Sequence, residues 1–153
     1  MTEKMIKNIL LVCTGNICRS PMAECILRHR LGGKKDISIQ SAGVHAVDGT
    51  AASENAVKVL REWDMDLSPH RSRRLTDGLV MEADLILVMT EAHKSEVLRQ
   101  WPEAGEKVRL LCSFGTQGES RDIPDPIGLS LDAYRRIRDE IDSAISDLIL
   151  YLM

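Results

Sequence analysis

Two kinds of hydrophobic pattern alternate along the chain. Continuous apolar runs at 9–12 and 85–88 are typical of strands buried on both faces of a parallel sheet. The segments 37–41 and 108–111 predict two further, shorter strands. Each strand is followed by a segment in which apolar residues recur every three or four positions, as on the buried face of a helix. This alternation predicts a single three-layer α/β domain, with a four-stranded parallel sheet and helices on both faces.

Capping residues indicate where the predicted helices begin. Ser20 before Pro21 predicts an N-cap, because serine accepts a hydrogen bond from the first turn and proline fits that turn. Later helices are expected to begin at Ser53, Thr90 and Ser130. A short helix is expected around 76–82, whereas 113–128 has no regular pattern and predicts an irregular segment.

Length and composition favour one soluble enzyme-sized domain over several other classes. The 153 residues are 44% hydrophobic, enough for one core, so we expect a single domain over 1–153. A net charge of −3 argues against nucleic acid as the main partner. No segment is long and apolar enough to predict a membrane span or a signal peptide, so we expect a cytoplasmic protein. The four cysteines have no zinc-site spacing, and we expect neither a metal nor a cofactor.

The loop after the first strand contains the motif most directly connected with chemistry. Cys13 and Arg19 form a C-x5-R motif between a buried strand and a predicted helix start. Backbone N–H groups of such a loop converge with the helix N-terminus on one point, where they bind an anion. Glycine and asparagine adopt positive φ readily, as a loop folded around an anion requires. The sequence therefore predicts a phosphate-binding loop made of Thr14, Gly15, Asn16, Ile17, Cys18 and Arg19.

These residue types suit phosphoryl transfer. Arg19 and the loop N–H dipoles favour the thiolate form of Cys13, which is its nucleophilic form. The arginine can also hold two phosphate oxygens at once, and Ser20 can hydrogen-bond the sulfur. Because the leaving oxygen needs a proton, a carboxylic acid is expected nearby. Asp122 and Asp125 are both candidates, and chain order alone does not choose between them.

Three motifs together resemble a known family, the low-molecular-weight protein tyrosine phosphatases. They are the loop LVCTGNICRSPMAE, the Ser-Ala-Gly at 41–43 and the Asp-Pro-x-Gly at 125–128, in this order, and the resemblance extends over essentially the whole chain. It implies a phosphocysteine on Cys13, phosphate binding by Arg19, and Asp125 as general acid and then general base. It also implies that the loop is supported by Asn16, Ser20, Ser41 and His70.

Two walls of the implied substrate pocket depart from the family pattern. Many relatives have an aromatic residue after the Asp-Pro pair, where this chain has Ile127. On the opposite wall an aromatic residue is usual two positions past the Ser-Ala-Gly, and here His45 is the match. We therefore expect a substrate ring to meet an aliphatic side chain and an imidazole.

Substrate choice within the family remains open between several readings. Relatives that resemble protein-arginine phosphatases have threonine where this chain has Ile17, so we favour phosphotyrosine proteins, with a bacterial tyrosine kinase as a candidate partner. Arsenate reductases of this fold use two further cysteines after the third strand, and 89–101 contains none. A non-catalytic phosphate-binding module is less favoured, because nucleophile, arginine and acid are all present.

Cys18 is a candidate redox residue. It lies five positions from Cys13 in the same loop, so the two sulfurs can meet. A neighbouring thiol traps an oxidised nucleophile as a disulfide before irreversible oxidation. Filling space beneath the loop is the alternative role for Cys18.

Overall fold

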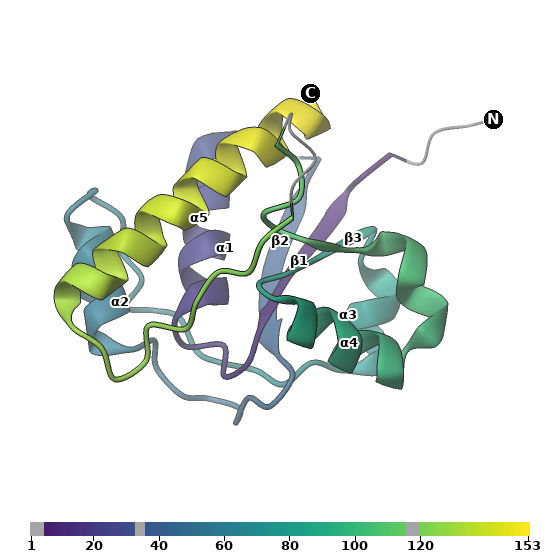
Figure 1. Cartoon of the computed structure of the whole chain (residues 1–153), viewed down its shortest axis with the longest axis horizontal. Coiled ribbons are helices and arrows are strands. Elements are labelled where there is room, and N and C mark those ends of the chain that lie inside the picture. Colours follow the sequence, from purple (N-terminus) through teal and green to yellow (C-terminus); the bar gives the residue numbers. More distant parts are fainter. Residues whose placement is uncertain (1–4, 33–35, 116–119) are drawn as a thin grey trace.

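Four parallel strands form the sheet predicted from the sequence. The computed structural model describes residues 5–32, 36–115 and 120–153. The strands pair in the order β2-β1-β3-β4, which makes β1 and β3 the two central strands (Figure 1). Their bounds are β1 Asn8–Cys13, β2 Ser38–Gly43, β3 Leu85–Val88 and β4 Val108–Leu110.

Helices cover both faces of the sheet, as the alternating pattern predicts. One face carries α1 (Arg19–Leu31), α2 (Glu54–Arg61) and the long α5 (Leu131–Leu152), and the other carries α3 (Asp77–Glu82) and α4 (Glu91–Gln100) (Figure 1). A 3-10 helix at Pro102–Lys107, which the hydrophobic pattern did not indicate, leads into β4. No helix in the described ranges is long and apolar enough to cross a membrane.

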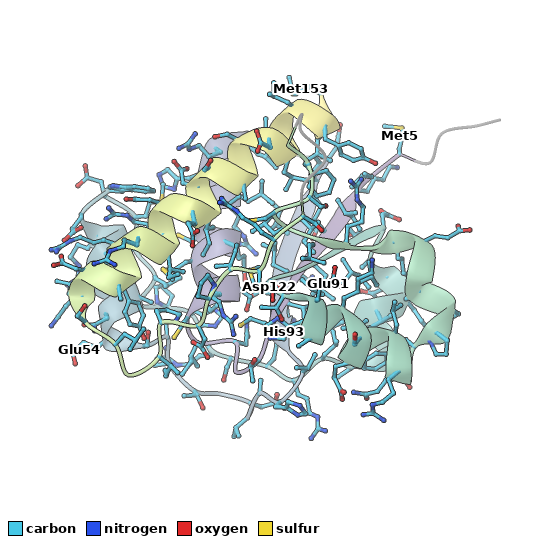
Figure 2. The ribbon with its side chains drawn as sticks, viewed as in Figure 1. Met5, Glu54, Glu91, His93, Asp122 and Met153 are labelled. Carbon is cyan, nitrogen blue, oxygen red and sulfur yellow. The ribbon has the colours of Figure 1, made fainter. Side chains whose placement is uncertain are left out.

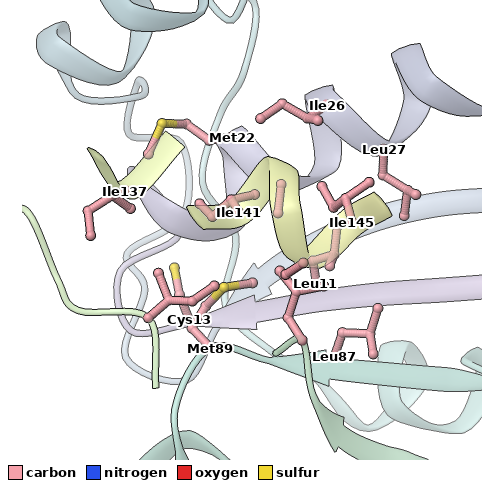
Figure 3. Close-up of a cluster of buried hydrophobic side chains, with 14 of the residues drawn as sticks. Leu11, Cys13, Met22, Ile26, Leu27, Leu87, Met89, Ile137, Ile141 and Ile145 are labelled. Atoms are coloured by element: carbon pink, nitrogen blue, oxygen red, sulfur yellow. The ribbon is translucent and has the colours of Figure 1, made fainter. Parts of the chain in front are cut away.

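Strand β1 contributes to two separate hydrophobic clusters because its side chains alternate between the faces of the sheet. Leu11 and Cys13 belong to the cluster beneath α1 and α5, whereas Leu10 and Val12 belong to the cluster beneath α3 and α4. Figure 3 shows Leu11 and Cys13 with Ile141 of α5. Burial on both faces explains why the run at 9–12 is apolar without alternation.

The strand order places a crevice at the carboxyl ends of β1 and β3. The chain leaves β1 toward α1 on one face and leaves β3 toward α4 on the other. Ligands of doubly wound sheets bind where neighbouring strands diverge in this way. The loop after β1 and the start of α4 therefore frame the candidate site.

One predicted helix cap is wrong. Helix α1 begins at Arg19 after Cys18, and no side chain caps its first turn. The Ser20 hydroxyl lies 2.9 Å from the Cys13 sulfur instead, so a long-range contact replaces the local cap. The other predicted caps are confirmed, since side chains accept first-turn N–H bonds at Ser53, Thr90 and Ser130.

Candidate active site

The loop between β1 and α1 directs its carbonyl groups away from its centre. The carbonyls of Cys13, Thr14 and Ile17 accept backbone N–H bonds of 2.9–3.0 Å from the segment between β2 and α2. By contrast, the N–H groups of residues 14–18 have no hydrogen-bond acceptor in the described part of the chain. Unpaired N–H groups in a tight loop form an anion-binding concavity.

A cavity of about 210 Å³ lies at this loop, and Cys13 is one of the residues that line it. Cys13 is the last residue of β1 and is 2% exposed. Its sulfur lies 2.9 Å from the Ser20 hydroxyl oxygen, which also accepts a 2.8 Å hydrogen bond from Asn16 Nδ2. Because the amide donates to the Ser20 oxygen, the hydroxyl proton is available to the sulfur, where it stabilises a thiolate.

Asn16 keeps the loop in its shape from inside the protein. Its φ of 57° is in the left-handed region, and its side chain is fully buried. Asn16 Nδ2 donates to Ser41 Oγ at 2.9 Å, and Asn16 Oδ1 accepts from the Arg73 N–H at 3.0 Å. His70 Nε2 lies 2.7 Å from the Asn16 carbonyl oxygen. The structure thus brings Ser41 and His70 to Asn16, and it adds Arg73, which the sequence did not indicate.

Gly43 allows the end of β2 to approach the loop closely. A Cβ atom at this position would lie 2.5 Å from the Thr14 carbonyl oxygen and 3.0 Å from the Asn16 nitrogen. The Ser-Ala-Gly motif therefore has two physical tasks, a hydrogen bond from its first residue and a lack of side chain at its last. Glu24 of α1, which sequence reasoning missed, accepts the hydroxyl proton of Ser41.

Arg19 is a buried cation with donors to spare. It is 4% exposed, and Nη1 donates to the Ile123 carbonyl at 2.9 Å. Nη2 lies 3.4 Å from Thr14 Oγ1 and 3.6 Å from Asp125 Oδ2, while Nε has no partner among the described residues. An anion in the cavity would complete this guanidinium, because a buried N–H group without an acceptor is unfavourable.

The structure separates the two candidate acids. Asp125 lines the cavity that holds Cys13, and its Oδ1 accepts the Ile127 N–H at 3.0 Å. Asp122 Oδ1 instead accepts the Glu91 N–H at 2.9 Å, at the start of α4. Figure 2 shows Asp122 beside Glu91 and His93. Of the two, only Asp125 faces the sulfur's cavity.

The predicted pocket walls divide between two cavities. Ile127, which is 50% exposed, lines the cavity of Cys13 together with Ile17. His45 lines a neighbouring cavity of about 660 Å³, with Asp122 and His93. Among the described residues that line the cavity of Cys13, Ile17 and Ile127 are the aliphatic ones.

Cys18 lines the cavity of Cys13 but is held in a buried position. Its sulfur lies 3.3 Å from both Ser53 Oγ and the Tyr134 hydroxyl. Burial raises the pKa of the Cys18 thiol, and it also raises the pKa of Tyr134 to about 12. In the described ranges no group of three or more His, Cys, Asp or Glu residues is placed to hold a metal ion.

His93 is a buried polar residue near the loop that the sequence did not indicate. Its Nε2 lies 2.8 Å from Thr14 Oγ1, although the two residues are 79 positions apart. The site residues predicted from the sequence follow the first, second and fourth strands, and none of them follows the third. The strand order β2-β1-β3-β4, once known, points to the start of α4 as well.

Cysteine-dependent phosphatases combine an anion-binding loop with a buried cysteine, a buried arginine and a nearby carboxylate. This chain has all four at the end of a central parallel strand. Residues 8–152 match the family described as "Low molecular weight phosphotyrosine protein phosphatase". The chain belongs to this family, whose members are cysteine-dependent enzymes.

The relatives include both protein-tyrosine and protein-arginine phosphatases. The chain is 42% identical to a probable low molecular weight protein-tyrosine-phosphatase, EpsP, of Ralstonia nicotianae, over 92% of each chain. It is 40% identical to a protein-arginine-phosphatase of Geobacillus stearothermophilus, also over 92% of each. A cysteine-to-serine variant of the YwlE arginine phosphatase, solved with its active-site serine phosphorylated, has a TM-score of 0.88 and 38% identity, with 95% of each chain covered.

Proposed function

We propose that this protein hydrolyses phosphotyrosine in proteins through a phosphocysteine formed on Cys13. The observation that carries the proposal is a set of hydrogen-bond donors without acceptors around one cavity. The N–H groups of loop residues 14–18 and Arg19 Nε have no partner in the described chain, and Cys13 lies among them. A phosphoryl group has the charge and the acceptor oxygens to satisfy these donors.

In the first chemical step the Cys13 thiolate attacks phosphorus and the bond to the tyrosine oxygen breaks. Arg19 and the loop amides hold the equatorial oxygens, where charge lies in the transition state. Asp125, in its acid form, gives its proton to the departing oxygen. Its place on the cavity wall, next to Ile127, supports this role over the same role for Asp122.

The second step releases inorganic phosphate. The Asp125 carboxylate takes a proton from water, the water oxygen attacks phosphorus, and the sulfur–phosphorus bond breaks. The Ser20 hydroxyl, 2.9 Å from the sulfur, stabilises the thiolate as it leaves. Asn16, Ser41 and His70 keep the loop folded throughout both steps.

The aliphatic lining supports an aryl substrate. Ile17 and Ile127 offer apolar surface, and neither offers a polar atom to a guanidinium group. Phosphoarginine is the second candidate, because a relative 40% identical over 92% of each chain is named a protein-arginine-phosphatase. We propose a phosphotyrosine protein as the substrate, a bacterial tyrosine kinase as its source, and one domain over 1–153.

The test compares two peptides of one sequence, phosphorylated on tyrosine or on arginine. We expect a higher kcat/KM for the phosphotyrosine peptide, and we expect Ile17→Thr to shift the ratio toward phosphoarginine by about 10- to 200-fold. Ile17→Val is the matched control, because valine has the shape of threonine without its hydroxyl. A native enzyme with higher kcat/KM on phosphoarginine would overturn the assignment of substrate.

A further inference from the structure

His93 lies at the crevice between the loop after β1 and the start of α4. It is in the first turn of α4, after β3, and is 5% exposed. Figure 2 shows His93 beside Asp122, at the carboxyl ends of the strands. The mechanism above gives this buried imidazole no part.

The Thr14 hydroxyl connects Arg19 to His93. Arg19 Nη2, 3.4 Å away, can only donate, so Thr14 Oγ1 accepts on that side. Thr14 Oγ1 also lies 2.8 Å from His93 Nε2, in a second hydrogen bond whose donor depends on the tautomer of the ring. The Thr14 hydroxyl is therefore held between Arg19 on one side and His93 on the other, which fixes the position of its oxygen.

A neutral imidazole is what this arrangement requires. Burial and the nearby positive charge of Arg19 lower the pKa of His93 to about 4. A protonated ring would add a second buried positive charge near Arg19, and its Nδ1 proton would lack an acceptor in the described chain. His93 is consequently uncharged at neutral pH and is no general acid for a leaving group.

We propose that His93 is a positioning residue for phosphoryl transfer, because its bond to Thr14 Oγ1 holds the oxygen that accepts from Arg19 Nη2 and so aims the guanidinium into the cavity. The proposal rests on the proposed function and gives a part in it to a residue on the opposite side of the crevice. Arg19 has one firm bond, to the Ile123 carbonyl, and its other contacts are long. The Thr14 contact therefore restricts where Nη2 lies before substrate arrives.

The test is a double-mutant cycle with an aryl phosphate substrate. His93→Phe and Thr14→Val each remove one end of the same hydrogen bond, and each is expected to lower kcat/KM by about 10-fold, mostly through kcat. The double variant is expected to lose no more than either single one. His93→Gln can place an amide near the position of Nε2, so we expect it to regain activity to within about 3-fold of the native enzyme.

Vanadate and phosphate inhibition give the readout that a purely structural role would not move. Vanadate mimics the five-coordinate transition state, so its inhibition constant is expected to rise more than that of phosphate in His93→Phe. His29→Phe, an exposed change in the last turn of α1, is the matched control and should alter neither constant. Additive losses in the cycle, or native kcat in both His93→Phe and Thr14→Val, would overturn the proposal.

The outcome is separable from failure of the proposed function. Phosphate binding, measured by calorimetry on native protein and on each variant, reports on Arg19 whatever the physiological substrate. If native protein binds phosphate but the cycle is additive, the role of His93 is wrong while the phosphate site stands. If native protein does not bind phosphate or turn over aryl phosphates, the proposed function itself is wrong.

Discussion

Replacing Gly43 with alanine tests whether the end of β2 sets the shape of the phosphate-binding loop. The added Cβ would lie 2.5 Å from the Thr14 carbonyl oxygen and 2.9 Å from the Ala46 Cβ. Neither of these atoms is at the end of a flexible side chain, so the backbone must move. A separation of 3.0 Å from the Thr14 oxygen already requires a displacement of 0.5 Å.

The displacement falls on the loop that we propose binds phosphate. Misplacing reacting groups by about 1 Å costs on the order of 100-fold in rate, so we expect Gly43→Ala to lower kcat/KM by about 10- to 100-fold. Overpacking costs about 1–3 kcal/mol, and the lower chain entropy of alanine returns about 0.4–1 kcal/mol. The free energy of unfolding is therefore expected to fall by about 1–2 kcal/mol.

The assay is kcat/KM on an aryl phosphate together with urea unfolding of the same protein. Gly105→Ala is the matched control, because a Cβ there meets nothing within 4 Å. It should leave both quantities near their native values. Native kcat/KM in Gly43→Ala would refute the argument that this close approach shapes the loop.

Three further changes test other parts of the account. Asp125→Asn should slow aryl phosphates with poor leaving groups far more than those with good ones, and equal losses measured across a leaving-group series would move the acid role, with Asp122 next in line. The pKa of His93 is about 4 in the folded protein against an ordinary 6.5, so the unfolded chain binds the proton first as the pH falls. Between pH 7 and pH 5, the free energy of unfolding of the native protein should therefore fall by about 2 kcal/mol more than that of His93→Gln, as measured by urea unfolding. Parallel pH curves for the two proteins would contradict this. Mild peroxide should give a Cys13–Cys18 disulfide, which peptide mapping detects. The disulfide should form faster as the pH rises, because burial raises the pKa of the Cys18 thiol. Finding Cys13 only as higher oxides would count against this prediction.

Local pattern was enough for the architecture because the decisive signals are short-range. The apolar runs at 9–12 and 85–88 reflect burial on both faces, and the structure places both strands at the centre of the sheet. Ser53 and Thr90 cap their helices as predicted, since a cap depends on the next three residues. Ser20 fails as a cap because its hydroxyl contacts the Cys13 sulfur, an interaction that local sequence does not contain.

The candidate site was predictable where a motif is contiguous and less so where the fold assembles it. The loop residues adjoin one another in the chain, and the resemblance added Asp125, Ser41 and His70. Asp122 could be separated from Asp125 only by where each carboxylate lies. His93 escaped notice because its contact with Thr14 depends on the strand order.

The central claim is that Cys13 carries the phosphoryl group, and rapid quenching tests it most directly. Native enzyme is mixed with a phosphotyrosine peptide, quenched within one turnover and digested, and the peptide that contains Cys13 is examined by mass spectrometry. We predict a phosphoryl group on Cys13, more of it in Asp125→Asn with a good leaving group, where the release of phosphate is slowed. Turnover without phosphorylated Cys13 at any quench time, or phosphate found on another residue, would contradict the account.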